Sequence, residues 1–331
     1  MKDLFGEPRR LRYRMWIIYS ALFVFIVAGG YLISRNVINQ PWSARTNVSS
    51  AVIGDQIYIV GGQSQSTGML LDEVLRIDPH RASLSFVTHL PYACYRPATL
   101  VSHDYLFILG GYDGRSYRSE ILQVVDGEAH VVARLPSPRS YGTAISAGNT
   151  LYYAGGWDGD KLLDEIVAID LDSNEVMVVA RLSSPRQFVT AGAVGDFIYF
   201  VGGEGARAEF SDEIVEFDPG QDRIVRTGHL PTGRYLTNVI SWNNGLLVLA
   251  GKNTRFLEDV VFVTISDTAI TSELIDQIPE LSWRLAVEEL DNRIFIIGGS
   301  NPEFKRSIRL LEYIPGSEAL ISLELRGHVW K

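Results

Sequence analysis

The sequence predicts an all-β fold, a six-bladed β-propeller of four-stranded antiparallel blades, preceded by one N-terminal transmembrane helix. Three observations support this prediction. A strand-like phrase that ends on a glycine pair, or on Ala-Gly in one case, returns six times, the repeats fill the chain from residue 45 onward, and an uncharged apolar segment lies near the N-terminus. A repeat of nearly fifty residues is typical of propellers in which each repeat forms one blade.

The uncharged segment is residues 15–34. A helix of this length, rising about 1.5 Å per residue, would cross the hydrocarbon core of a bilayer. Four arginines precede it, Arg9, Arg10, Arg12 and Arg14, and basic residues stay on the cytoplasmic side. We therefore expect a cytoplasmic basic tail at 1–14, a transmembrane anchor at 15–34, a linker at 35–44 and the propeller at 45–331. With one cysteine and one glycosylation sequon in the sequence, we expect a bacterial inner membrane and a periplasmic propeller.

The six repeats share a doublet of small residues at the end of a strand-like run. The doublets are Gly61–Gly62, Gly110–Gly111, Gly155–Gly156, Gly202–Gly203, Ala250–Gly251 and Gly298–Gly299, spaced by 49, 45, 47, 48 and 48 residues. Glycine suits a strand end where the backbone passes close to a neighbour or needs a positive φ. A third strand follows the doublet and begins with acids at 71–78, 163–170 and 211–218, and a fourth strand closes the repeat. In the sixth repeat the fourth strand is expected at 319–325.

This pattern resembles the kelch-repeat β-propellers from about residue 45 to residue 331. It departs from them where a Trp is usual early in the fourth strand, because Phe86, Val176 and Ile224 stand there. Chain direction places the loop before each first strand on the same face as the loop after each glycine pair. We name this the loop face, and the opposite face, with its tight turns, the turn face. The resemblance implies that the ligand site lies on the loop face, around the mouth of the central channel.

The loop face is predicted to be rich in arginine and aromatic residues, the chemistry of binding surfaces. An arginine lies 14 or 16 residues before every doublet: Arg45, Arg96, Arg139, Arg186, Arg234 and Arg284. The neighbouring candidates are Tyr112, Tyr141, Trp157, Phe188, Arg207 and Tyr235. Two interpretations of the arginines stay open. They bind an acidic ligand, since guanidinium groups match carboxylates, or they hold the scaffold by pairing with the acids of the third strands.

Composition excludes several functions. The net charge is −9; residues 1–35 contribute six basic and two acidic residues, so the remainder carries −13. An acidic body argues against nucleic-acid binding. The single cysteine, Cys94, allows no intrachain disulfide, and the six histidines show no metal-ligand spacing. With no phosphate loop or nucleophile motif, we expect no metal, no cofactor and no catalytic residues.

The sequence therefore favours a membrane-tethered interaction module: a receptor, assembly factor or structural subunit that binds a membrane protein or complex. The resemblance adds that adaptor-type kelch propellers contact acidic peptides with arginines at positions like Arg139 and Arg186. It also supplies an alternative, an acidic-sugar binding protein or mutarotase like the periplasmic sialic acid mutarotases. Glu204 and Glu209, beside Arg207, would then be the candidates for general acid–base catalysis.

Overall fold

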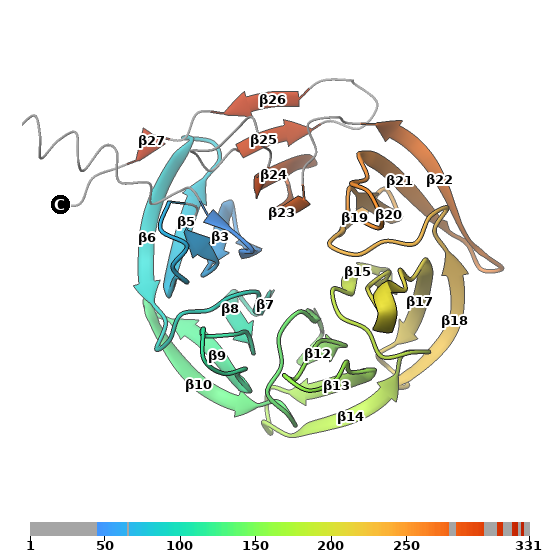
Figure 1. Ribbon diagram of the computed structural model, residues 1–331, viewed down its shortest axis with the longest axis horizontal. Helices are drawn as coiled ribbons and strands as arrows, with labels where there is room; N and C mark the ends of the chain where they lie inside the picture. Colours follow the sequence, from blue (N-terminus) through green and yellow to red (C-terminus); the bar gives the residue numbers. More distant parts are fainter. Residues whose placement is uncertain are drawn as a thin grey trace, which may run out of the picture. The chain divides into compact units, whose positions relative to one another are not determined.

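Six antiparallel sheets follow one another along the chain and are arranged around a common axis (Figure 1). The structure, a computed structural model, describes residues 45–64, 66–277, 283–300, 310–313, 320–323 and 326–327, which lie within one compact unit, Ser43–His328. The predicted six-bladed propeller of four-stranded blades is confirmed. The predicted tail, anchor and linker, residues 1–44, lie outside the described residues. Among those described, no helix has the length and apolar character needed to cross a bilayer.

Each blade consists of four consecutive strands, the first nearest the axis and the fourth on the rim (Figure 1). Blade 1 contains β2 (Ser49–Ile53), β3 (Gln56–Val60), β5 (Glu73–Asp78) and β6 (Ser83–His89). Blade 2 contains β7 (Ala98–Ser102), β8 (Tyr105–Leu109), β9 (Glu120–Val125) and β10 (Glu128–Arg134). Blade 3 contains β11 (Thr143–Ala147), β12 (Thr150–Ala154), β13 (Glu165–Asp170) and β14 (Val176–Arg181).

The remaining blades repeat this order. Blade 4 contains β15 (Thr190–Val194), β16 (Phe197–Val201), β17 (Glu213–Asp218) and β18 (Arg223–His229). Blade 5 contains β19 (Asn238–Trp242), β20 (Gly245–Leu249), β21 (Asp259–Ile265) and β22 (Ile270–Gln277). Blade 6 contains β23 (Trp283–Leu290), β24 (Arg293–Ser300), β25 (Leu310–Tyr313) and β26 (Leu320–Leu323). A short pair, β1 (Arg45–Thr46) with β4 (Gln63–Ser64), and one 3-10 turn, η1 (Ala206–Ala208), lie outside the blades.

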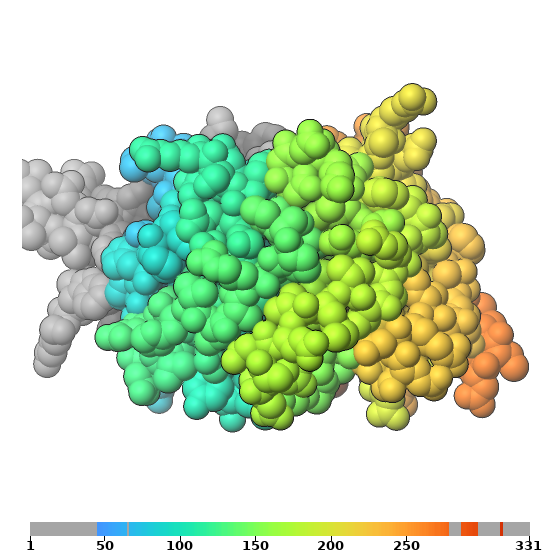
Figure 2. Space-filling view, turned by 90° about the horizontal axis from the view of Figure 1, so that it is seen from below, coloured from blue at the N-terminus to red at the C-terminus, as the bar shows by residue number. Residues whose placement is uncertain are grey.

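The blades bury their faces against one another. Six apolar clusters lie between successive blades, and each draws side chains from both. Alternate residues of a strand point to opposite faces, so one strand supplies two clusters. In β8, Phe107 and Leu109 pack toward blade 3 and Leu106 and Ile108 toward blade 1. In Figure 2 the successive blades follow one another across the surface in sequence order.

The ring closes by packing between blade 6 and blade 1, because the first four strands of every blade come from one continuous segment of the chain. Ile57 and Ile59 of blade 1 pack with Ala286 and Phe295 of blade 6. The expected fourth strand of the last repeat is confirmed as β26, at the outer edge of blade 6. Beyond it, β27 (Arg326–Gly327) pairs in parallel with β6, so the C-terminal part of the chain also contacts the rim of blade 1.

The glycine doublets occur where the backbones of adjacent blades meet. Gly155 has a φ of 67°, and a Cβ there would lie 2.6 Å from the carbonyl oxygen of Arg186 in the next blade. Gly202 repeats this geometry with a φ of 65° and the carbonyl oxygen of Arg234. Any side chain would force the two loops apart. Both predicted reasons for glycine, close approach and positive φ, therefore apply.

Candidate functional site

Four of the six predicted arginines are buried inside the loop face. Arg45, Arg139, Arg186 and Arg234 expose no more than 3% of their surface. Each pairs with the acid that begins the third strand of its own blade: Glu73 at 2.7 Å, Glu165 at 2.7 Å, Glu213 at 2.8 Å and Asp259 at 2.7 Å. These arginines tie the loop before the first strand to the third strand. The geometry supports the scaffold interpretation for these four.

In blade 2 the equivalent position holds Cys94. Its carbonyl oxygen accepts a hydrogen bond from Gly62 N–H at 2.8 Å, as that of Arg139 does from Gly111 N–H at 2.9 Å. The thiol is fully buried, and burial raises its pKa well above the usual range. The missing guanidinium is supplied by Arg118, which pairs with Glu120, the first residue of β9, at 3.1 Å. Cys94 thus occupies the position that holds the buried arginine in blades 1, 3, 4 and 5, and its role there is structural.

Arg96 is therefore equivalent to the residue two positions after the buried arginine. It shares a left-handed backbone with the residues at that position in other blades: Asn47 (φ 58°), Arg96 (48°), Tyr141 (64°), Phe188 (57°) and Leu236 (54°). Tyr141 N–H donates to the Arg96 carbonyl at 3.5 Å, and Phe188 N–H donates to the Tyr141 carbonyl at 2.5 Å. Left-handed conformations are unfavourable for residues with a side chain and concentrate at functional sites.

Aromatic side chains meet across four blades at this level. We name this set the aromatic arc: Tyr95, Tyr112, Tyr117, Tyr141, Phe188, Phe210 and Tyr235. Ring centroids lie 5.1 Å apart for Tyr141 and Phe188, 5.5 Å for Phe188 and Tyr235, and 5.4 Å for the stacked Tyr235 and Phe210. Tyr112 and Tyr117 extend the arc at 5.0 Å, and Tyr117 reaches Tyr141 at 6.4 Å. The arc therefore spans blades 2 to 5.

Arg96 contacts the arc from blade 2. Its guanidinium carbon lies 5.2 Å from the ring centroid of Phe188 in blade 4, and its Nε donates to Asn47 Oδ1 at 2.8 Å. All members of the arc and Arg96 are partly buried, neither core nor fully exposed. Burial raises the pKa of Tyr141 far above its usual value, so its hydroxyl stays protonated. The assembled surface offers aromatic rings, tyrosine hydroxyls and one guanidinium.

Of the other predicted site residues, Trp157 adjoins the aromatic arc, because its side chain lies within hydrogen-bonding reach of Tyr117. Trp157 is partly buried, and its backbone pairs with Ser140 and Leu162. Arg207 lies in η1 with a φ of 58° and is exposed. Arg284 belongs to β23, and its side chain lies outside the described part of the structure. Glu204 accepts a hydrogen bond from Gln187 Nε2 at 3.1 Å, whereas Glu209 is exposed on the η1 loop.

Sequence reasoning placed Arg96 and Arg284 in one class with the buried arginines and left Tyr95 out of the site. The spacing distinguished them: the four buried arginines lie 16 residues before the doublet, whereas Arg96, which is partly buried, lies 14 residues before it. Within the described ranges, no group of three His, Cys, Asp or Glu side chains is arranged to hold a metal ion.

Comparison with known proteins identifies the repeat. The model of the KLHDC2/KLHL20/DRC7 Kelch-repeats domain matches residues 47–223, just over half of the chain. A search of curated proteins gives no match. Among solved structures, the one titled "Structure of YjhT" is similar in fold, with a TM-score of 0.63 and 19% sequence identity over 69% of this chain and 84% of that one. The chain therefore belongs to the kelch-repeat family of β-propellers.

Proposed function

We propose that this chain is a membrane-tethered interaction module that binds another protein through the aromatic arc and Arg96. The observation that carries the proposal is the arc itself: seven rings from four blades, held together yet partly exposed at one mouth of the channel. A scaffold alone would bury such rings in the interblade clusters. Tyr and Arg in a half-desolvated setting are typical of the residues that dominate protein–protein binding.

Exposed apolar side chains on the loop face extend this surface. Met69, in the loop after the doublet of blade 1, is 67% exposed, and Phe256, in the equivalent loop of blade 5, is 50% exposed. Lys252 Nζ lies 5.2 Å from the Phe256 ring centroid. Apolar groups that surround a partly buried aromatic centre indicate an interaction surface. The partner we propose is a membrane protein or complex, because the predicted anchor and its ten-residue linker would keep the propeller near the bilayer.

The proposal differs from a simple acid-binding arginine ring. Four guanidinium groups are already neutralised by their own carboxylates, so they add little attraction for an acidic ligand. Arg96, with the exposed Arg207, supplies the positive charge near the mouth. We therefore propose a partner that presents apolar or aromatic side chains with an acidic group to meet Arg96.

Site-specific photo-crosslinking tests the proposal in intact membranes. A photoreactive phenylalanine analogue replaces Tyr112 or Tyr235 on the loop face, or Tyr105 on the turn face as the matched control. Tyr105 is 42% exposed, so its lack of product would not reflect burial. We expect a discrete adduct from positions 112 and 235, and its loss when Arg96→Ala is added. Equal adducts from position 105, or none from the arc, would contradict the proposal.

The alternative function, an acidic-sugar binding protein or mutarotase, would need a carboxylate and a cation that converge on one enclosed space. Glu204 is engaged by Gln187, and Arg207 and Glu209 are exposed on the η1 loop. We therefore propose a binding role without catalysis for the loop face. Turnover of an acidic sugar that depends on Glu204 or Glu209 would favour the alternative instead.

A further inference from the structure

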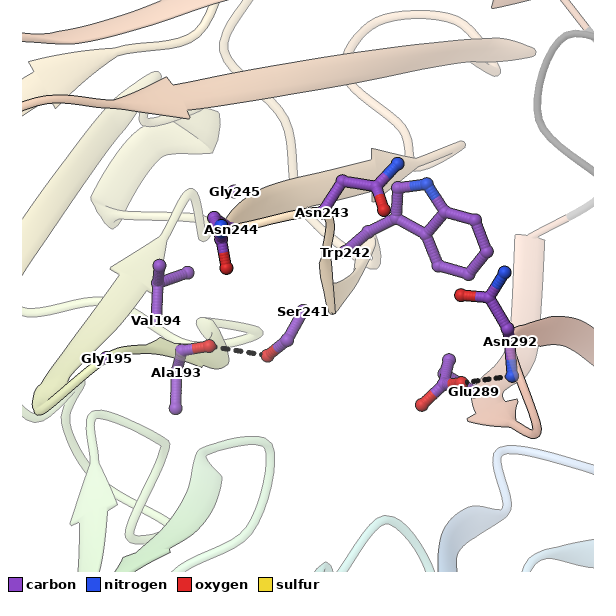
Figure 3. A pocket seen from close by; sticks show the side chains of 10 residues that line it. All are labelled: Ala193, Val194, Gly195, Ser241, Trp242, Asn243, Asn244, Gly245, Glu289 and Asn292. Carbon is purple, nitrogen blue, oxygen red and sulfur yellow. Dashed lines mark hydrogen bonds between the residues drawn. The ribbon is translucent and has the colours of Figure 1, made fainter.

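A pocket of about 280 Å³ opens on the turn face, where the first turns of blades 4, 5 and 6 meet (Figure 3). It lies at the end of the blades opposite the aromatic arc. Among its lining side chains are Ser241, Trp242, Asn243, Asn244, Glu289 and Asn292. Its size is near the lower end of the range of roughly 300–1,000 Å³ for small-molecule sites, so it would fit one ring-sized ligand.

The wall of the pocket is fixed by contacts between and within blades. Ser241 Oγ donates to the carbonyl oxygen of Ala193 at 2.6 Å, which joins blade 5 to blade 4 (Figure 3). Glu289 Oε1 accepts from the backbone N–H of Asn292 at 2.8 Å, which orients the carboxylate and leaves Oε2 for another partner. A pocket whose polar groups are oriented in advance loses less entropy on binding.

Trp242 provides the apolar surface. The residues at this register in the other blades, each paired with the first residue of a second strand, are Ile53, Ser102, Ala147, Val194 and Leu290. Trp242 alone is aromatic, and its cross-strand partner is Gly245. The indole packs against the cluster between blades 5 and 6 but stays partly exposed. One face of the rigid Trp242 indole therefore lines the pocket.

Three amides line the pocket: Asn243 and Asn292 lie beside the indole, and Asn244 lies farther from it, above Val194 (Figure 3). Asn243 and Asn244 have φ values of 47° and 58°, the backbone of a tight hairpin turn that favours asparagine. Within the part of the chain that the structure describes, the side-chain amides of Asn243, Asn244 and Asn292 make no hydrogen bond to protein atoms. Each amide offers two donor hydrogens and one acceptor oxygen. The turn accounts for the residue type, and the unbonded amides remain available to a ligand.

The charge of the pocket excludes anions. Among the described residues that line the pocket, Glu289 carries the charge. The nearby Arg293 is paired with Glu312 at 2.5 Å. A carboxylated or phosphorylated ligand would therefore meet repulsion from Glu289, and the described lining residues include no cation to offset it. A cationic ligand would use the indole and Glu289 but would offer no acceptor to the six amide donor hydrogens. Vicinal hydroxyl groups both donate and accept, as amides do, and a sugar ring has an apolar C–H face that suits an aromatic face.

We propose that the turn-face pocket binds a neutral monosaccharide, stacked on Trp242 and hydrogen-bonded by Asn243, Asn244, Asn292 and Glu289. This site is separate from the loop face and does not depend on the proposed function.

Saturation-transfer NMR with the full-length chain, kept in a detergent without a sugar head group, tests this. The probes are glucose, galactose, mannose and N-acetylglucosamine, with N-acetylneuraminic acid and choline as charged comparisons. We expect saturable binding of at least one neutral sugar and none of the charged probes. Trp242→Leu should weaken binding at least tenfold, whereas Trp242→Phe, which keeps an aromatic face and the fold, should retain part of it.

Tyr105→Leu is the matched control, because Tyr105 is an exposed aromatic residue on the same face, at the first turn of blade 2. It should leave sugar binding unchanged. No saturable binding of the four neutral sugars, stronger binding of either charged probe, or equal loss in the Tyr105 and Trp242 variants would overturn the proposal.

Discussion

Blades 2 and 3 place a guanidinium beside the third-strand acid with residues from different parts of the blade. In blade 3, Arg139 is fully buried in the loop before the first strand and pairs with Glu165. In blade 2 that position is Cys94, and Arg118, two residues before Glu120, supplies the cation. The propeller therefore requires a guanidinium next to each third-strand acid, but not at one fixed place in the chain. Blade 2 also has Arg96, two residues after Cys94, where it contacts Asn47 and the ring of Phe188 on the loop face.

Glu120 and Glu288 are two carboxylates whose pKa values shift in opposite directions. Burial acts to raise the pKa of Glu120, but hydrogen bonds and the charges of Arg134 and Arg118 hold it below its usual value. Glu288, on β23 beside blade 1, has Ser50 Oγ at 2.5 Å as its hydrogen-bond donor. Burial raises its pKa to about 7, and the Ser50 hydrogen bond only partly offsets this. Glu288 thus lies where blade 6 meets blade 1, and its hydrogen-bond partner among the described residues is Ser50.

The largest effect is expected from removing a buried arginine. Arg139→Ala would leave Glu165 partly buried with only a longer contact to Arg181, at 3.7 Å, and we expect a loss of about 3 kcal/mol in unfolding free energy, the lower end for broken buried pairs. Urea unfolding would measure it. The control is Arg81→Ala, since Arg81 is 82% exposed at its pair with Asp78 and surface pairs contribute roughly 0–1 kcal/mol. Equal shifts for the two variants would refute the scaffold role.

Glu288→Gln should make stability less dependent on pH. Between its ordinary pKa of 4.5 and about 7, the folded protein holds a proton on Glu288 that the unfolded chain has released. The unfolding free energy therefore falls as pH rises through this range, by up to about 3 kcal/mol at roughly 1.4 kcal/mol per pKa unit. Unfolding midpoints of both proteins at pH 5 and pH 8 would measure the difference. The variant should gain stability mainly at pH 8; an equal gain at both values would contradict the assignment.

Exchanging the residues of blade 2 should rebuild the arrangement of blade 3. Arg118→Leu removes one of the two cations at Glu120 and leaves the more exposed Arg134 at 2.8 Å, and Cys94→Arg places a further cation beside Arg118; we expect each to cost about 1 to 2 kcal/mol. Together they recreate the pattern of Arg139 and Leu163, so the double variant should be less destabilised than the sum of the single variants. A double-mutant cycle by urea unfolding tests this. Simple additivity would mean that Arg118 does not replace the missing arginine.

The smallest effect on stability is expected at Arg96. Because Arg96 is only partly buried at the channel mouth, Arg96→Ala should change the unfolding free energy by less than about 1 kcal/mol. The same variant should abolish the adducts formed from positions 112 and 235. A stability loss as large as that of Arg139→Ala would place Arg96 with the scaffold residues and remove its distinct role.

The sequence by itself determined the architecture. Five glycine doublets and one Ala-Gly at nearly constant spacing sufficed to predict the number of blades and their order. The same close backbone approach recurs at the four junctions from blade 1 to blade 5. Chain direction was enough to predict the loop face, and the acids at the starts of third strands were visible in the repeats. When the same local geometry recurs in each repeat, the residues that it requires recur at regular intervals in the sequence. This period is visible without knowing what each repeat contacts.

The tertiary structure decided which residues are available to a partner. Arg96 and Arg139 look alike in sequence, yet a shift of two positions separates a contact at the channel mouth from a fully buried ion pair. The aromatic arc, the Trp242 pocket and the Glu288 seam combine side chains from blades that are 45 or more residues apart. Such sites have no local signature, because their chemistry arises only when the closed ring brings separate loops and turns together.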